Sequence, residues 1–202
     1  MKTLAFIALI SITYFVVGLI ILHFLRSDIN PVKQATAYYA VGAHRFIMTS
    51  VFFSVFVASV ALLIGFYQGI MASARSNLGL VLLGLWSAGV LVALCFPINP
   101  EGVPMTIPAR IHRMSTPAIF LCLTLGIIFI SRSFRQDSNW YPIYHSASVL
   151  SWLMLVTFIA TFVVAITKTG FLGLAQRASL AIFAIWVIVV AARMLVVAGG
   201  EG

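Results

Sequence analysis

The residues with the widest chemical range in this sequence are histidines and charged residues at the ends of long apolar segments. His23 ends the first apolar segment, His44 opens the second and His112 opens the fourth. Asp28 and Glu101 lie in the polar stretches between these segments. Imidazole, carboxylate and guanidinium groups gathered in one place can bind an anion, hold a metal or haem, or transfer protons. The fold decides which of these chemistries is possible.

One alternative is a single b-type haem held by two histidines from different helices. His44 and His112 are the candidate axial ligands, and nearby arginines would face the propionates. His145 opens the fifth apolar segment at the opposite end and has no histidine partner at its level. The sequence therefore does not predict the two-haem arrangement of a transmembrane electron carrier.

Metal binding and hydrolysis are the other two chemistries. No pair among His23, His44 and His112 has the i, i+3 or i, i+4 spacing of a helical ligand motif, so no metal is predicted. His112, Ser115 and Asp28 include the residue types of a base, a nucleophile and an orienting carboxylate, as a hydrolase or transferase needs. No nucleophile elbow accompanies them, so no catalytic residue is predicted.

The elements that must position these residues follow from composition. Apolar residues make up 62% of the chain and charged residues 8%, against roughly 25% charged residues in soluble domains. Spanning a bilayer takes about 20 apolar residues in a helix. Six stretches qualify and predict an all-α membrane protein, one transmembrane domain covering residues 1–202: 4–25, 46–70, 78–98, 111–130, 143–167 and 178–198. The fourth is expected to begin between Thr106 and Ile111, with Thr106 as cap and Pro108 in the first turn.

Six spans put both termini on one face of the membrane, here named side A, together with the connections 71–77 and 131–142. Side B then carries the loops 26–45, 99–113 and 168–177. Short connections on side A and longer ones on side B indicate three helical hairpins. Side B has seven lysines and arginines (Arg26, Lys33, Arg45, Arg110, Arg113, Lys168, Arg177) and side A has five (Lys2, Arg75, Arg132, Arg135, Arg193). The positive-inside rule favours side B as cytoplasmic, and we expect residence in the bacterial inner membrane.

Three features bear on packing. Small residues follow one face of the second span: Ser50, Ser54, Ala58, Ala61, Gly65 and Gly69. Such a face lets a neighbouring helix approach closely, so this span is expected inside the bundle. Arg193, inside the last span, is expected either to extend towards side A or to meet a polar partner. Trp140, Tyr141 and Tyr144 are interpreted as an aromatic belt at the side A interface.

Short motifs between the spans form an ordered series: Ser27-Asp28-Ile29-Asn30-Pro31, Tyr39-Ala40-Val41-Gly42, Phe96-Pro97, Ile111-His112, and Gly173-Leu174 with Gln176-Arg177. Together they resemble the bacterial membrane family designated domain of unknown function 998, over nearly the whole chain. The resemblance implies a multi-helix membrane bundle without an established activity. By position, the family pattern includes Asp28, Pro97, His112 and Arg177. His44 lies outside this pattern, which counts against the haem alternative.

The sequence thus predicts a non-catalytic membrane protein with a polar mouth on side B. This mouth is expected to bind an anionic lipid or small ligand, or to dock a partner membrane protein. The candidate ligand-binding residues are Asp28, Arg110, His112, Arg113 and Arg177. Membrane lipids are the expected partners, with a partner membrane protein or a homo-oligomer as further possibilities and no nucleic acid. No cofactor is predicted; a redox protein with haem b and an intramembrane hydrolase or transferase are the alternatives.

Overall fold

The computed structural model describes residues 1–100 and 102–200, which form six long helices and contain no strand. The long helices are α1 (Lys2–Leu25), α2 (Arg45–Gly69), α3 (Asn77–Cys95), α4 (Ile107–Ser133), α5 (Tyr144–Thr167) and α6 (Leu172–Gly199). Three short 3-10 helices lie between them: η1 (Thr36–Ala40), η2 (Phe134–Gln136) and η3 (Tyr141–Ile143). All six long helices have the length and apolar composition needed to cross a bilayer. The prediction of an all-helical membrane bundle is confirmed.

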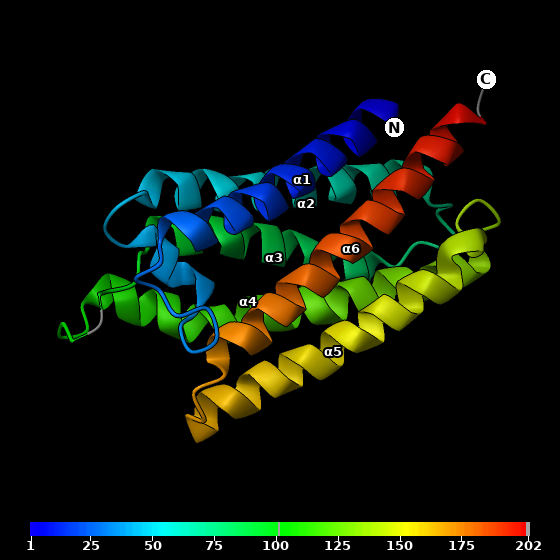
Figure 1. Ribbon diagram of the computed structural model, residues 1–202. Coiled ribbons are helices and arrows are strands. Elements are labelled where there is room, and N and C mark those ends of the chain that lie inside the picture. Colours follow the sequence, from blue (N-terminus) through cyan, green and yellow to red (C-terminus); the bar gives the residue numbers. More distant parts are fainter. Residues whose placement is uncertain (101, 201–202) are drawn as a thin grey trace.

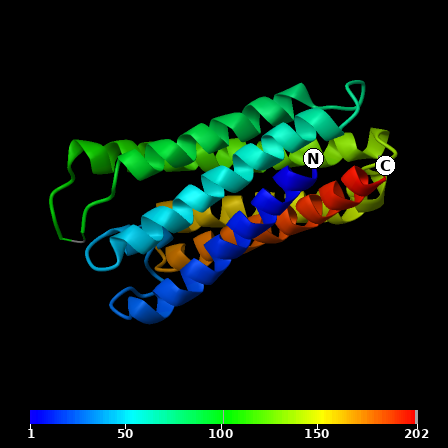
Figure 2. The same ribbon diagram turned by 90° about the horizontal axis from the view of Figure 1, so that it is seen from above.

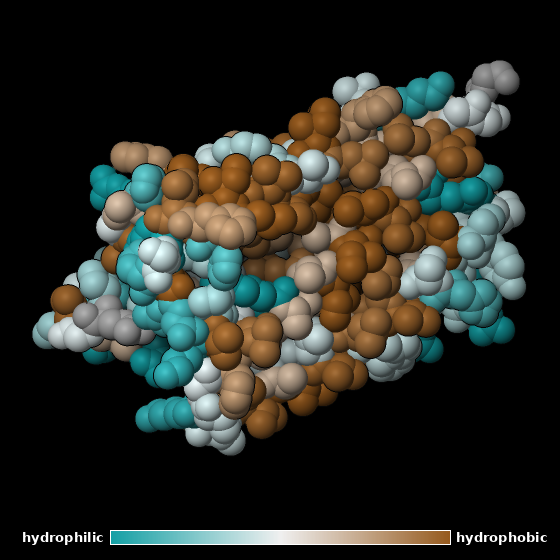
Figure 3. Space-filling model, viewed as in Figure 1, coloured by the Kyte–Doolittle hydropathy of each residue, from teal (hydrophilic) through white to brown (hydrophobic). Residues whose placement is uncertain are grey.

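Each long helix packs beside its neighbours in sequence, and contacts of α6 with α1 and α2 close the bundle. The N- and C-termini lie at the same end, as the six spans require (Figures 1 and 2). Figure 3 shows an apolar band across the middle of the visible face, with hydrophilic residues gathered towards the two ends. This distribution is expected for a protein that spans a bilayer, with apolar residues in the hydrocarbon core and polar residues in the two aqueous phases. The grouping into three hairpins is not established by this closed arrangement.

Two helix starts explain how the polar residues of side B are placed. α4 begins where its cap was expected, since the Thr106 hydroxyl accepts a hydrogen bond from the Ala109 amide, with Pro108 in the first turn. α6 begins at Leu172, six residues before the predicted position 178. The apolar stretch marks only the part of a helix that lies in hydrocarbon, whereas the helix itself continues into the polar region. Gln176 and Arg177 are therefore helical residues and do not belong to a loop.

The small-residue face of α2 lies inside the bundle, as predicted. Gly65 contacts Met194 of α6 so closely that an added Cβ would overlap that side chain. Ser50, at the other end of this face, shares a hydrogen bond of 2.8 Å with the Tyr14 hydroxyl of α1. Ala58 is fully buried. Close backbone approach at this face lets dispersion contacts hold α2 against α1 and α6 within lipid.

The side A end is closed by residues that differ from the aromatic belt expected there. Trp140 is completely buried, and its indole donates a hydrogen bond of 2.8 Å to the Gly69 carbonyl. Only Tyr141 of that segment is strongly exposed. The interpretation of Trp140 as a belt residue was wrong, because the loop after α4 folds back over the end of α2. Arg193 donates a hydrogen bond of 2.6 Å to the Asn139 carbonyl of the same loop.

Candidate functional site

The segment 27–44, named here the strap, lies over the side B ends of several helices and is anchored first by Arg26. The Arg26 guanidinium is buried and donates to both carboxylate oxygens of Asp28 at 2.7 Å. It also donates to the carbonyls of Val41 at 2.6 Å and Ala43 at 2.9 Å. The hydrogen bonds from Arg26 hold the pKa of the exposed Asp28 carboxyl below its usual range. One cation therefore ties both ends of the strap to the end of α1.

The second anchor of the strap is Arg177, near the start of α6. Its guanidinium donates to the carbonyls of Pro31 at 2.7 Å and Gln34 at 2.9 Å. It also donates to the Tyr39 hydroxyl at 3.1 Å and lies over the Tyr39 ring. One turn earlier, Gly173 lies against the same two strap carbonyls, where an added Cβ would collide with both. The missing side chain of Gly173 thus allows the close approach that Arg177 stabilises.

Gln176 gives the third attachment and leads into the cavity. Its side-chain oxygen accepts hydrogen bonds from the Thr36 amide at 2.9 Å and from the Thr36 hydroxyl at 3.0 Å. Because an amide N–H can only donate, these bonds identify which end of the carboxamide is oxygen. The Gln176 NH₂ group has no partner in the described part of the chain.

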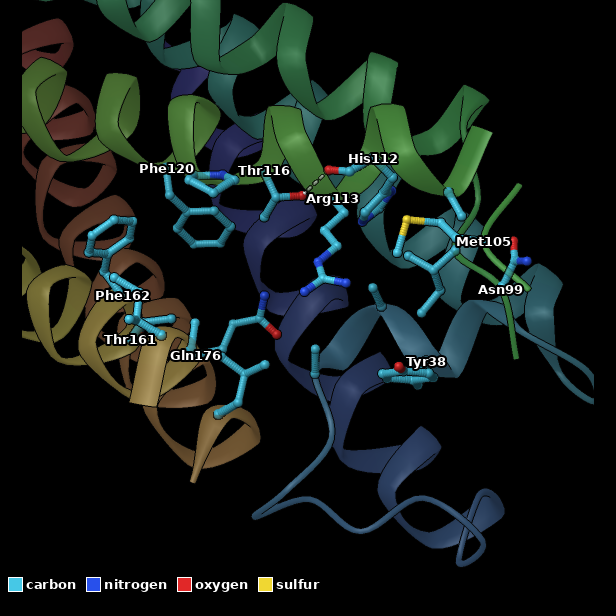
Figure 4. Close-up of a pocket in the computed structure, with 18 of the residues that line it drawn as sticks. Tyr38, Asn99, Met105, His112, Arg113, Thr116, Phe120, Thr161, Phe162 and Gln176 are labelled. Atoms are coloured by element: carbon cyan, nitrogen blue, oxygen red, sulfur yellow. Dashed lines mark hydrogen bonds between the residues drawn. The ribbon is translucent and has the colours of Figure 1, made fainter. Parts of the chain in front are cut away.

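A cavity of about 650 Å³ lies beneath the strap, between η1, residues 98–100 and 102–105, and helices α4, α5 and α6 (Figure 4). Its side B end is lined by polar side chains that include Asn99, His112, Arg113 and Gln176. Its deeper end is lined by aromatic residues such as Phe120, which lies seven residues beyond Arg113 on α4, or about 10 Å along the helix. The cavity is therefore polar at one end and apolar at the other, and it lies within the range of volumes typical of ligand sites.

Arg113 is the cation of this cavity. Its side chain extends from α4 into the space between Gln176 and Tyr38 (Figure 4). Within residues 1–100 and 102–200 its guanidinium has no hydrogen bond and no ion pair. This contrasts with Arg26 and Arg177, whose donors are engaged by carbonyl and side-chain oxygens.

His112, one residue earlier, is held in a fixed orientation. Its Nδ1 lies 2.8 Å from the Phe96 carbonyl at the end of α3. A carbonyl can only accept a hydrogen bond, so Nδ1 carries the proton and Nε2 is left for another partner. His112 also lines a second, smaller cavity of about 210 Å³ beside the first. The ring therefore stands between two spaces that a ligand or water could occupy.

The residues proposed for hydrolysis are not assembled. The Ser115 hydroxyl donates to the backbone carbonyl of His112 at 3.2 Å and does not bond its ring. The His112 ring is hydrogen-bonded to the Phe96 backbone carbonyl, and the Asp28 carboxylate accepts hydrogen bonds from Arg26. Base, nucleophile and carboxylate thus have other partners.

The other predicted site residues lie around the cavity or away from it. His44 is an exposed residue with φ of 60° at the start of α2, and it lines neither cavity, whereas His112 lines both. Arg110 is exposed on α4 outside the cavity lining, and Glu101 falls outside the described residues. Among the residues described, no group of three or more His, Cys, Asp or Glu side chains could hold a metal.

Sequence reasoning missed Gln176 as a cavity residue, although the Gln176-Arg177 motif contained the signal. It also missed Thr116, Thr161 and Ser179, because hydroxyls inside apolar spans have no distinctive pattern. These three hydroxyls donate to carbonyls of their own helices, at 2.7, 2.8 and 3.2 Å. The donors left for a ligand are those of Arg113 and the Gln176 NH₂ group, and they suit an anion. With the proton on Nδ1, the Nε2 atom of His112 is an acceptor and can take a hydrogen bond from a hydroxyl of the ligand.

Comparison with known protein families identifies the family of this chain. A family model described as protein of unknown function (DUF998) matches residues 9–193. No curated protein and no solved structure matches the chain. The matched region includes all of the strap, the cavity lining and both arginine anchors. The chain, a multi-pass integral membrane protein with six spanning helices, belongs to the DUF998 family.

Proposed function

We propose that this protein binds an anionic group, either a lipid headgroup or a small anion, in the side B cavity. Arg113 would hold the charge and the Gln176 NH₂ group would donate to the same anionic group, while His112 Nε2 would accept a hydrogen bond from a hydroxyl of the ligand. The observation that carries the proposal is a guanidinium that extends into a cavity without a partner in the described chain. Arginine in such a position is well suited to planar, bidentate recognition of phosphate or carboxylate.

The charge balance of the cavity supports an anion. No described residue of the lining is acidic, whereas Arg113 supplies a guanidinium cation. Arg113 is exposed at this polar end of the cavity, so its guanidinium is accessible to an anion that enters there.

Arg177 and Asp28, both predicted as ligand-binding residues, would instead act by holding the strap in place together with Arg26. Arg26 and Arg177 hold the strap, and the strap contributes Ala35, Ala37 and Tyr38 to the cavity wall. Asp28 is engaged by Arg26 and would not contact the ligand. Binding would therefore rest on Arg113, with the strap as a fixed cover.

The test compares Arg113→Gln with Arg110→Gln in the full chain, purified in a neutral detergent. Arg110 is on the same helix and exposed but lies outside the cavity lining, so it is a matched control. Native mass spectrometry would count bound phosphatidylglycerol, and titration would measure inorganic phosphate. Loss of a charge-assisted hydrogen bond of about 1.5–3 kcal/mol predicts about a 10- to 150-fold weaker affinity in Arg113→Gln alone. Equal binding by both variants would refute the proposal and leave docking of a partner membrane protein as the role of this end.

We also propose that the protein resides in a bacterial plasma membrane with side B in the cytoplasm. The support is the excess of lysine and arginine in the side B loops. A single cysteine placed at Lys33 of the strap, in a background without Cys95 and Cys122, should be protected from an impermeant thiol reagent in intact cells. Labelling of that cysteine in intact cells would reverse the orientation.

A further inference from the structure

We infer that the ligand is a lipid whose acyl chain leaves the cavity sideways, between α4 and α5, into the bilayer core. This inference rests on the proposed function, because it takes the anionic group at Arg113 as the head of the ligand. It adds the chemical class of the ligand and the route by which it arrives.

The first observation is the shape of the apolar end. Lining residues on α4 recur on one face, with Arg113, Pro117 and Phe120 in succession. On α5, Phe158 and Phe162 lie on the face that meets them. Phe120 and Phe162 lie farther from the side B start of α4 than the Arg113 guanidinium does (Figure 4). A chain that starts at Arg113 and runs along α4 would therefore contact apolar side chains over about 10 Å.

The second observation is that one side of this apolar end is open. In the side B half of α5, residues 155–167, no side chain is buried. Phe162 lines the cavity and is still 49% exposed. Contacts between α4 and α5 are the least extensive of those between long helices that follow one another in the sequence. The two helices lie close at the side A end and separate towards side B (Figure 1).

The position of this opening decides between occupants. Both helices span the membrane, so the gap between them faces hydrocarbon, and only a membrane-resident molecule can fill it from that direction. A helix from a partner protein would place its own apolar residues against the unpaired charge of Arg113, which is unfavourable. A lipid matches both ends, since its charged head meets Arg113 and its chain runs in the direction of the bilayer core.

The test uses the full chain in nanodiscs that contain phosphatidylglycerol with a photoreactive group on the acyl chain. Crosslinks should map to the lining faces of α4 and α5, and phosphatidylcholine with the same chain should give few. Arg113→Gln should remove the crosslinks. Crosslinks spread evenly around all six helices would overturn the inference.

A filling variant separates the inference from the proposed function. Ala165→Trp would occupy the open side of the cavity, whereas Ala160→Trp is the control because Ala160 is exposed on the same helix and lies outside the lining. Ala165→Trp should reduce crosslinking at least tenfold and leave binding of inorganic phosphate unchanged. Unchanged crosslinking would overturn the proposed route of the acyl chain between α4 and α5 but not the anion site. Phosphate binding that is unaffected by Arg113→Gln would instead overturn the anion site. Should Ala165→Trp unfold, the crosslinking map of the unmodified chain still decides.

Discussion

Replacement of Arg177 by Met should release the strap from α6 while leaving the six-helix bundle intact. The side chain keeps its length and loses every donor. Two of the bonds that disappear join α6 to backbone carbonyls of the strap, at 2.7 Å from Pro31 and 2.9 Å from Gln34. Hydrogen bonds from a charged donor contribute about 1.5–3 kcal/mol each. Taking the lower value for both, because the site is half-buried, gives about 3 kcal/mol.

That loss should appear as faster hydrogen exchange of the strap. A change of about 3 kcal/mol in the opening free energy corresponds to about a hundredfold increase in the exchange rate of amides protected by strap closure. The Thr36 amide, which donates to Gln176, is the most direct reporter, followed by the Val41 amide, which donates to Tyr38. Hydrogen exchange followed by mass spectrometry in nanodiscs gives both rates.

The controls are chosen to isolate the guanidinium. Arg177→Lys keeps the charge and some donors but cannot bridge the same carbonyls, so its effect should be intermediate. Arg135→Gln, an exposed change near side A, should leave the strap amides unchanged. Exchange in Arg177→Met that equals the wild type would show that Arg177 does not hold the strap, and the assignment of its role would be rejected.

Three further predictions follow from the same contacts. Gly173→Ala should displace the strap and speed exchange of its amides, because a Cβ there meets two strap carbonyls; Gly199→Ala on the same helix, in open space, should have no such effect. Asp28→Asn should lower the thermal stability above about pH 4. Because the pKa of Asp28 is depressed in the folded state, its carboxylate stabilises the fold above the unfolded-state pKa, and this stabilisation is lost as the pH falls through the folded-state pKa. The melting temperatures of the variant and the wild type should therefore converge in acid. Ser131→Ala should destabilise the bundle by about 1–3 kcal/mol in denaturant titration, because it leaves the buried indole N–H of Trp186 without its acceptor, and an unchanged midpoint would contradict this.

The spans could be predicted from sequence because hydrocarbon imposes one strong rule, a long apolar helix for every crossing. The ends of the helices were harder to predict, because polar residues such as Gln176 continue a helix beyond the apolar stretch. The order of the spans also placed Arg113 and His112 correctly together on side B, and both residues line the cavity.

What sequence could not supply was the distinction between arginines that are engaged and one that is not. Arg26, Arg113 and Arg177 all lie near helix ends on side B and look alike in the sequence. Only the folded strap brings carbonyls to Arg26 and Arg177 and none to Arg113. The same applies to Asp28, whose carboxylate is directed to Arg26 by a local turn and not towards His112.

The central claim is that Arg113 holds the anionic group of a ligand inside the side B cavity. The most direct measurement is a density map of the protein in a bilayer rich in phosphatidylglycerol. The account predicts a phosphate-sized density within hydrogen-bond distance of the Arg113 guanidinium, continuous with a chain that passes between α4 and α5. A cavity filled by the protein's own side chains, or an Arg113 side chain turned away to an internal partner, would contradict it.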